Sequence, residues 1–122
     1  MEPIDHFSLE HYYIVSSILL GDNLKIIFEN KVDKNELRVL DLKGVVGYID
    51  SSSANKKLKI LQIREEGSAY NLDLSMRLHK PQIQNLPEVF IFIDERCTDF
   101  CFRAVAETIE FREWEVKDKW LP

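Results

Sequence analysis

Apolar residues recur at every second position through much of this chain, the spacing that is typical of β-strands. The most continuous apolar run, residues 89–93, contains only aromatic and β-branched residues and is followed by the charged pair Asp94 and Glu95. A short run of this composition, with Pro87 on its other side, predicts a strand that is buried on both faces. We therefore expect residues 89–93 to lie at the centre of the core.

The apolar residues of the segment 100–111 fit the periodicity of a strand and, in part, that of a helix. Their apolar side chains alternate at period two, as in a strand, but part of the segment also fits the i, i+3, i+4, i+7 spacing of a helix. Aromatic and β-branched residues are frequent here and favour a strand. The alternation resumes at Ile109 and Phe111 after a slip of one residue, which a β-bulge near Glu107 and Thr108 would explain.

The alternative for the same segment is a helix capped by Thr98 or Asp99. In either structure the acidic side chains are expected to face solvent, namely Glu107, Glu110, Glu113 and Glu115. The end of the chain is therefore predicted to present an acidic surface.

The first third of the chain predicts a β-hairpin. Residues 11–20 and 24–28 are separated by three turn-forming residues, Gly21, Asp22 and Asn23. Apolar residues occupy both faces of residues 11–20, so we expect both faces of that strand to be largely buried.

Three further segments predict strands. Residues 37–50 carry two apolar phases separated by Gly44 and Gly47, which indicates two short strands or one bent strand. Residues 58–63 form another strand. Residues 70–78 alternate without a break, as expected for a strand with one buried face.

Together these segments predict an all-β fold, or a β-rich α+β fold if a short helix forms near the C-terminus. About seven or eight short strands indicate an antiparallel β-sandwich or half-barrel. A length of 122 residues is sufficient for one core, so residues 1–122 are expected to form a single domain.

Charge narrows the classes of partner. The formal net charge is −5, and no basic stripe follows the predicted strands, which disfavours binding to nucleic acid. The N-terminus lacks the features of a signal peptide, and no apolar run approaches the length of a membrane span. We therefore expect a cytoplasmic protein without a membrane partner.

The residues that usually carry chemistry are sparse. Cys97 and Cys101 match neither a redox pair nor a zinc motif, and the three histidines His6, His11 and His79 lack metal-ligand spacing. No nucleophile elbow or glycine-rich phosphate loop is present. We therefore expect a protein that is not an enzyme, with no catalytic residue, no metal and no cofactor.

Aromatic residues are the better candidates for function. Trp114 and Trp120 are of the residue type that anchors protein interfaces when it lies outside the core. With the neighbouring carboxylates they form the predicted partner-binding set, namely Glu107, Glu110, Glu113, Trp114 and Trp120.

The segments NLKIIFEN, LRVLDLKGVVGYID, LKILQI and FCFRAVAETIEF together resemble small all-β bacterial domains, including some immunity proteins of polymorphic toxin systems. The similarity covers residues 24–111 and includes a hairpin that leads into a strand of the type φ-x-φ-x-G-V-x-x-φ. It implies a binder that neutralises a toxin and identifies no binding residue.

Our leading hypothesis is accordingly a non-enzymatic protein-binding domain, an immunity-type inhibitor of a bacterial toxin. One alternative is a small-ligand-binding β-barrel whose cavity is lined by Tyr12, Phe28, Tyr70 and Phe90. Another is a self-associating structural module that uses an edge strand. The oligomeric state and the identity of the partner stay open at this point.

Overall fold

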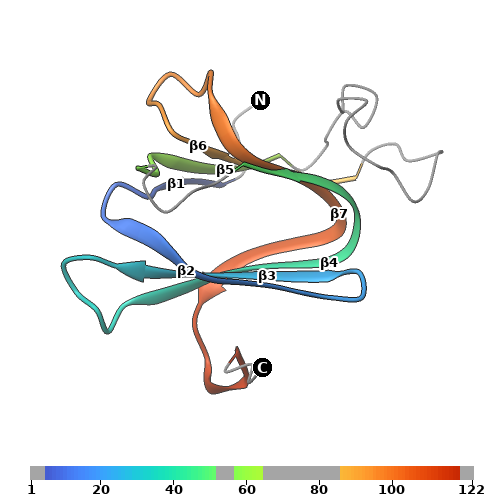
Figure 1. Ribbon diagram of the computed structural model, residues 1–122, viewed down its shortest axis with the longest axis horizontal. Helices are drawn as coiled ribbons and strands as arrows, with labels where there is room; N and C mark the ends of the chain where they lie inside the picture. The colour runs from blue at the N-terminus through green and yellow to red at the C-terminus, as the bar shows by residue number, and fades with distance from the viewer. Residues whose placement is uncertain (1–4, 52–56, 65–85, 119–122) are drawn as a thin grey trace.

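The computed structural model describes residues 5–51, 57–64 and 86–118, in which seven strands form one antiparallel sheet (Figure 1). In chain order these are β1 (Asp5–Ser8), β2 (Tyr12–Leu20), β3 (Asn23–Asn30), β4 (Leu37–Asp50), β5 (Ile60–Arg64), β6 (Glu88–Phe92) and β7 (Phe100–Glu113). A 3-10 turn, η2 (Val116–Asp118), follows β7. Across the sheet the order is β1-β5-β6-β7-β4-β3-β2.

The sheet curls into a half-barrel because its two longest strands bend together. β4 and β7 each contain fourteen residues and pair along most of their length. Figure 1 shows that β2 and β3 lie in one layer beyond this bend, and that β1, β5 and β6 lie in the other. The all-β antiparallel half-barrel predicted from the strand pattern is confirmed.

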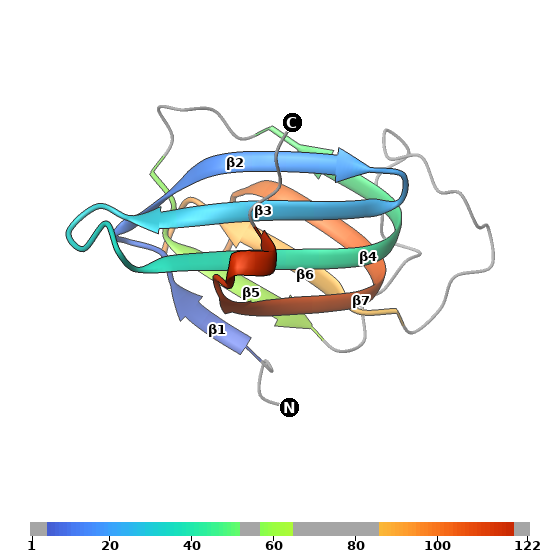
Figure 2. The same cartoon turned by 90° about the horizontal axis from the view of Figure 1, so that it is seen from below.

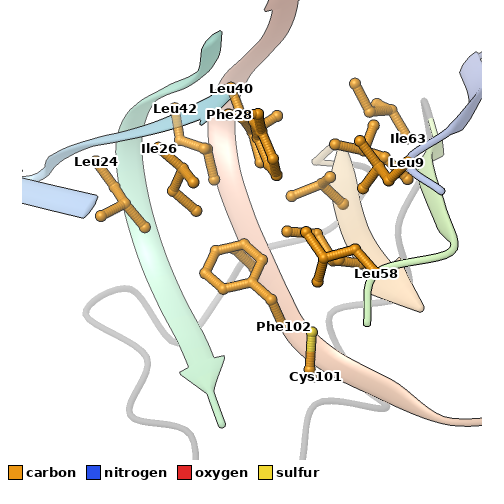
Figure 3. Packing of buried hydrophobic residues seen from close by; sticks show 14 of the residues in the cluster. Leu9, Leu24, Ile26, Phe28, Leu40, Leu42, Leu58, Ile63, Cys101 and Phe102 are labelled. Carbon is orange, nitrogen blue, oxygen red and sulfur yellow. The ribbon is translucent and has the colours of Figure 1, made fainter. Parts of the chain in front are cut away.

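The core fills the space between the two layers (Figure 3). It contains buried side chains from every strand except β1, among them Ile26, Phe28, Leu40, Leu42, Leu61, Ile91 and Phe102. All five residues of β6 are buried, and the strand lies between β5 and β7. The central strand predicted for residues 89–93 is therefore confirmed, but it begins at Glu88 and ends at Phe92, and Ile93 lies outside it and is only partly buried.

At the bend, the alternation of core-facing and outward-facing residues shifts by one position on β4 and on β7, at residues that pair with each other. On β4, Leu42 and Val45 both contribute to the core, and on β7 so do Ala106 and Ile109. Gly44 lies between the two β4 residues with φ of 67°, a left-handed value that favours glycine. The slip predicted from the alternation on β7 is thus real, and the strand continues through it. The helix considered for this segment is wrong.

The predicted position of the bulge is also wrong. Thr108 pairs with Lys43 and Ala106 pairs with Val45, so equal numbers of residues face each other at the slip. The extra residue lies on the partner strand, because the register shifts between Val45 and Gly47. The slip on β7 therefore results from a bend that β7 shares with β4. The sequence of β7 alone does not distinguish such a bend from a bulge.

The predicted hairpin is formed by β2 and β3. Gly21 adopts φ of 64° in the turn between them. The expectation that both faces of the first strand are largely buried is wrong, since Val15, Leu19 and Leu20 are exposed. This exposure has a topological cause: β2 is the last strand of the sheet.

The chain after β7 crosses the outer surface of the β2–β3 layer. Figure 2 shows η2 lying over β3 and β4 on the side away from the core. The strand predicted for residues 70–78 lies outside the described residues.

Candidate functional site

An open cleft of about 420 Å³ lies between the β3–β4 loop and the end of β7, where β4 begins. It is lined by Asp33, Asn35, Glu36, Leu37, Glu113 and Trp114. Three of these six residues carry a carboxylate, and one is a tryptophan.

The β3–β4 loop is held by its own polar groups. The side-chain oxygen of Asn30 accepts hydrogen bonds from the backbone N–H groups of Val32 (2.8 Å) and Asp33 (3.1 Å). The Asp33 carboxylate in turn accepts one from the N–H of Asn35 (3.1 Å). Asx turns of this kind fix a loop without apolar packing. The loop wall of the cleft is therefore ordered before any partner arrives.

Glu36 lies at the centre of the polar network behind this wall. Its carboxylate accepts hydrogen bonds from the Tyr12 hydroxyl, from Asn30 Nδ2 (3.2 Å) and from Arg38 Nη2 (3.3 Å). The Tyr12 hydrogen bond is the largest cause of a lowered pKa for Glu36, and Arg38 and Asn30 lower it further against the opposing effect of desolvation. Glu36 is therefore negative at neutral pH.

Arg38 connects the loop to the end of β7. Its Nη1 lies 3.7 Å from Glu113 Oε1, and its guanidinium lies 5.3 Å from the centre of the Phe7 ring. The backbone N–H of Trp114 donates to the carbonyl of Leu37 (3.1 Å), which places the indole beside the start of β4. The lining has three carboxylates and Arg38 pairs with two of them, Glu36 and Glu113, so the lining keeps a negative charge.

The structure brings two of the five predicted partner-binding residues into this cleft. Glu113 and Trp114 line it. Glu110 instead binds Arg112, with 2.9 Å between Oε1 and Nε, and Glu107 lies at the bend beside Gly44. Trp120 lies outside the described residues. All four acidic side chains predicted to face solvent, from Glu107 to Glu115, are exposed.

Sequence reasoning missed the loop half of the cleft. Asp33, Asn35 and Glu36 belong to a polar connection that is 77 to 80 residues before Glu113 in the chain. Asn and Asp at positions 30 and 33 are typical of a loop with internal hydrogen bonds, a signal that our sequence analysis did not use. The loop meets the end of β7 because β4, which follows the loop, pairs with β7, and this pairing was not predicted from the sequence.

A second charged cluster lies on the outer face of the β2–β3 layer. Asp118, whose side chain is fully buried, lies 2.9 Å from Lys25 Nζ and binds both terminal nitrogens of Arg112 at 2.5 and 2.6 Å. Arg112 also lies 3.0 Å from Asp41 Oδ2. Each charge in this cluster has an opposite partner inside the protein. The cluster therefore fastens the C-terminal turn to the sheet.

The same contacts shift pKa values. Hydrogen bonds from Arg112 are the largest cause of a strongly lowered pKa for Asp118, with the Glu115 N–H and Lys25 adding to it against desolvation. Asp118 raises the pKa of Arg112 in return.

Stability is consequently expected to depend on the protonation of Asp118. A carboxylate with a depressed folded-state pKa contributes stability above its unfolded value, about 3.9, and loses it as the pH falls through the folded value. The difference in unfolding free energy between the wild type and Asp118→Asn should be constant above about pH 5 and shrink progressively below about pH 4. Urea denaturation at a series of pH values measures this difference. A difference that stayed constant down to about pH 2 would contradict the assignment.

The aromatic residues considered for a ligand cavity do not share one face. Tyr12 and Phe28 belong to the core. Phe90 lies on the other side of its strand, where the guanidinium groups of Arg64 and Arg103 lie 4.8 and 5.1 Å from its ring centre. Arg103 also binds the buried Glu88 at 2.5 Å. Tyr70 lies outside the described residues.

Other candidate chemistry is limited in the described ranges. Neither Cys97 nor Cys101 is part of a disulfide, and Cys101 is buried. Among the described residues, no group of three or more His, Cys, Asp or Glu side chains is placed to hold a metal ion. No helix within these same ranges is long and apolar enough to span a membrane.

Fold and cleft together define an antiparallel β half-barrel with an acidic, tryptophan-containing cleft at one end. A comparison of the chain with protein-family models, with curated proteins and with solved structures finds no match.

Proposed function

We propose that this chain is a non-enzymatic protein-binding domain that receives a basic partner in the cleft between the β3–β4 loop and β7. The observation that carries the proposal is Trp114, which lines an open cleft together with three carboxylates. We further propose that the partner is a bacterial toxin, and that the protein acts in the cytoplasm as an immunity-type inhibitor of it.

Two physical arguments support a protein partner. Tryptophan is among the residues that contribute most to binding when it fills a pocket of the partner, because it buries a large area with few rotatable bonds. The surrounding carboxylates would attract a basic surface and raise the association rate.

The proposal is tested first by co-expression with the protein encoded by the adjacent gene. If that protein is toxic, expression of this chain is expected to restore growth, and the two proteins should purify as a stable 1:1 complex. If the adjacent protein is harmless and no complex forms, the immunity proposal fails.

Trp114→Ala is expected to weaken that complex by at least about 2 kcal/mol, roughly 30-fold in Kd, as for a residue that anchors an interface. Because Trp114 is only partly buried, the folded state should keep most of its stability. Isothermal titration calorimetry measures the affinity, and thermal unfolding measures the stability. A large loss of stability with unchanged affinity would assign Trp114 to structural packing instead.

Glu113→Lys is expected to slow association about tenfold at low salt, with a smaller effect at high salt, because it reverses one charge at the rim of the cleft. Stopped-flow association kinetics at two ionic strengths measure the effect. Glu95→Lys is the matched control, since it makes the same change on an exposed side chain in the loop between β6 and β7, which does not line the cleft. Equal slowing by both variants would show that net charge is responsible and would leave the cleft without a role.

A further inference from the structure

The two edges of the sheet differ in a way that indicates an interaction surface. The edge strand β1 has four residues, and its sequence includes Asp5 and His6. Short length and charge are the usual means by which an edge strand avoids pairing with another chain. The opposite edge strand, β2, has nine residues with the sequence YYIVSSILL, which contains no charged residue and no proline. Among the described strands, β1 therefore has the short length and charge that protect an edge, and β2 has neither.

The apolar side chains of β2 are also accessible. Val15 is 52% exposed, Leu19 45% and Leu20 58%, and they belong to a strand with a neighbour on one side only among the described strands. The register with β3 shifts between Ile14 and Ser16, whereas residues 16–20 pair with β3 without interruption. This regular part has the geometry that an added strand requires.

We propose that β2 pairs with β2 of a second copy of this chain, antiparallel and about a two-fold axis near Ser17. This arrangement places Val15 opposite Leu19 of the second copy and joins the two sheets into one. Two chains that each carry a net charge of −5 repel each other over most of their surface. Along β2 no like charges meet, so the repulsion is weakest there.

Charged residues at the two ends of β2 also favour a second copy of this chain as the partner. Lys31 lies beside the first end, because its backbone N–H donates to the carbonyl of His11 (2.6 Å). Asp22 lies in the turn at the other end, and all three residues are exposed. Antiparallel pairing about a two-fold axis brings Asp22 of each copy towards Lys31 and His11 of the other. The complementary contact occurs twice, which a strand from an unrelated protein would not provide.

Val15→Lys tests the interface. Analytical ultracentrifugation of the wild type is expected to show a concentration-dependent dimer, and the substitution should raise its dissociation constant at least about tenfold, because a charge enters both halves of the interface. Val116→Lys is the matched control, since Val116 is an exposed valine on η2, and it should leave the dimer unchanged. A wild type that is monomeric up to about 1 mM, or a dimer insensitive to Val15→Lys, would overturn the proposal.

The register is tested by cross-linking. Ser17→Cys in a Cys97→Ala background places one accessible thiol near the two-fold axis, where directly opposed strand residues are close enough for a disulfide. Mild oxidation is expected to give a covalent dimer, whereas Val116→Cys in the same background should not. A dimer that forms without this cross-link would show that the copies associate through another face. Neither test involves the cleft, so failure of the dimer proposal and failure of the proposed toxin binding can be distinguished.

Discussion

Replacing Asp118 with alanine is expected to lower the free energy of unfolding by about 3 kcal/mol, as for the loss of one partner of a buried ion pair. The Asp118 side chain is fully buried between Lys25 and Arg112, and it also accepts a hydrogen bond from the Glu115 N–H (2.8 Å). Its removal takes away the buried carboxylate that Lys25 and Arg112 share, and Arg112 keeps Asp41 and the exposed Glu110 as counter-ions. Denaturation by urea measures the loss.

Glu110→Ala provides the matched control, because Glu110 binds the same guanidinium from the other side. The Glu110 side chain is 65% exposed, and an ion pair in that position contributes at most about 1 kcal/mol. Each variant therefore removes one carboxylate that binds Arg112. The Asp118 carboxylate is buried, and the Glu110 carboxylate is exposed to water. Equal effects of the two substitutions would show that burial of Asp118 does not determine its contribution.

The elements that sequence reasoning predicted correctly are those whose signals are local. The hairpin of β2 and β3 follows from alternation around a glycine turn, and β6 follows from a short run of aromatic and β-branched residues. β7 was ambiguous from its own residues. Its fourteen-residue length is explained by β4, a strand of equal length that pairs with it.

The features that were missed depend on contacts between distant segments. The extra residue on β4 can be identified only when the register between β4 and β7 is known. The cleft likewise requires the loop after β3 to meet the end of β7. Asp118 follows the last strand and looks like an ordinary solvated charge in the sequence. It is buried because two cations on the outer face of the sheet lie where the chain turns back.

The exposed edge of β2 illustrates the same limit. Its sequence has apolar residues on both faces, as expected for a strand with two buried faces, and only the order of the described strands shows that it lies at the end of the sheet. An uncharged strand at an edge is a feature that natural proteins usually avoid. The conflict between pattern and position is therefore itself a sign of function, and it supports the pairing of two copies more strongly than the exposed side chains alone.

Gly44→Val is the second substitution with a large expected effect, a loss of about 3 kcal/mol in unfolding free energy. Gly44 has φ of 67°, which a β-branched residue adopts only with strain. A Cβ atom at this position would also lie 2.7 Å from Cγ, Cδ and Oε1 of Glu107 on the neighbouring strand. Because β4 and β7 bend together here, the strain acts at the point where the two layers of the half-barrel join.

A double-mutant cycle separates the two causes. Glu107→Ala removes the three atoms that a side chain at position 44 would meet, so Gly44→Val should cost about 1 kcal/mol less in that background. The remaining loss, about 2 kcal/mol, then reports the left-handed backbone alone. Thermal and urea unfolding of the wild type, both single variants and the double variant provide the four values. An unchanged cost in the Glu107→Ala background would mean that Glu107 moves aside freely, and that the bend depends on glycine only for its backbone conformation.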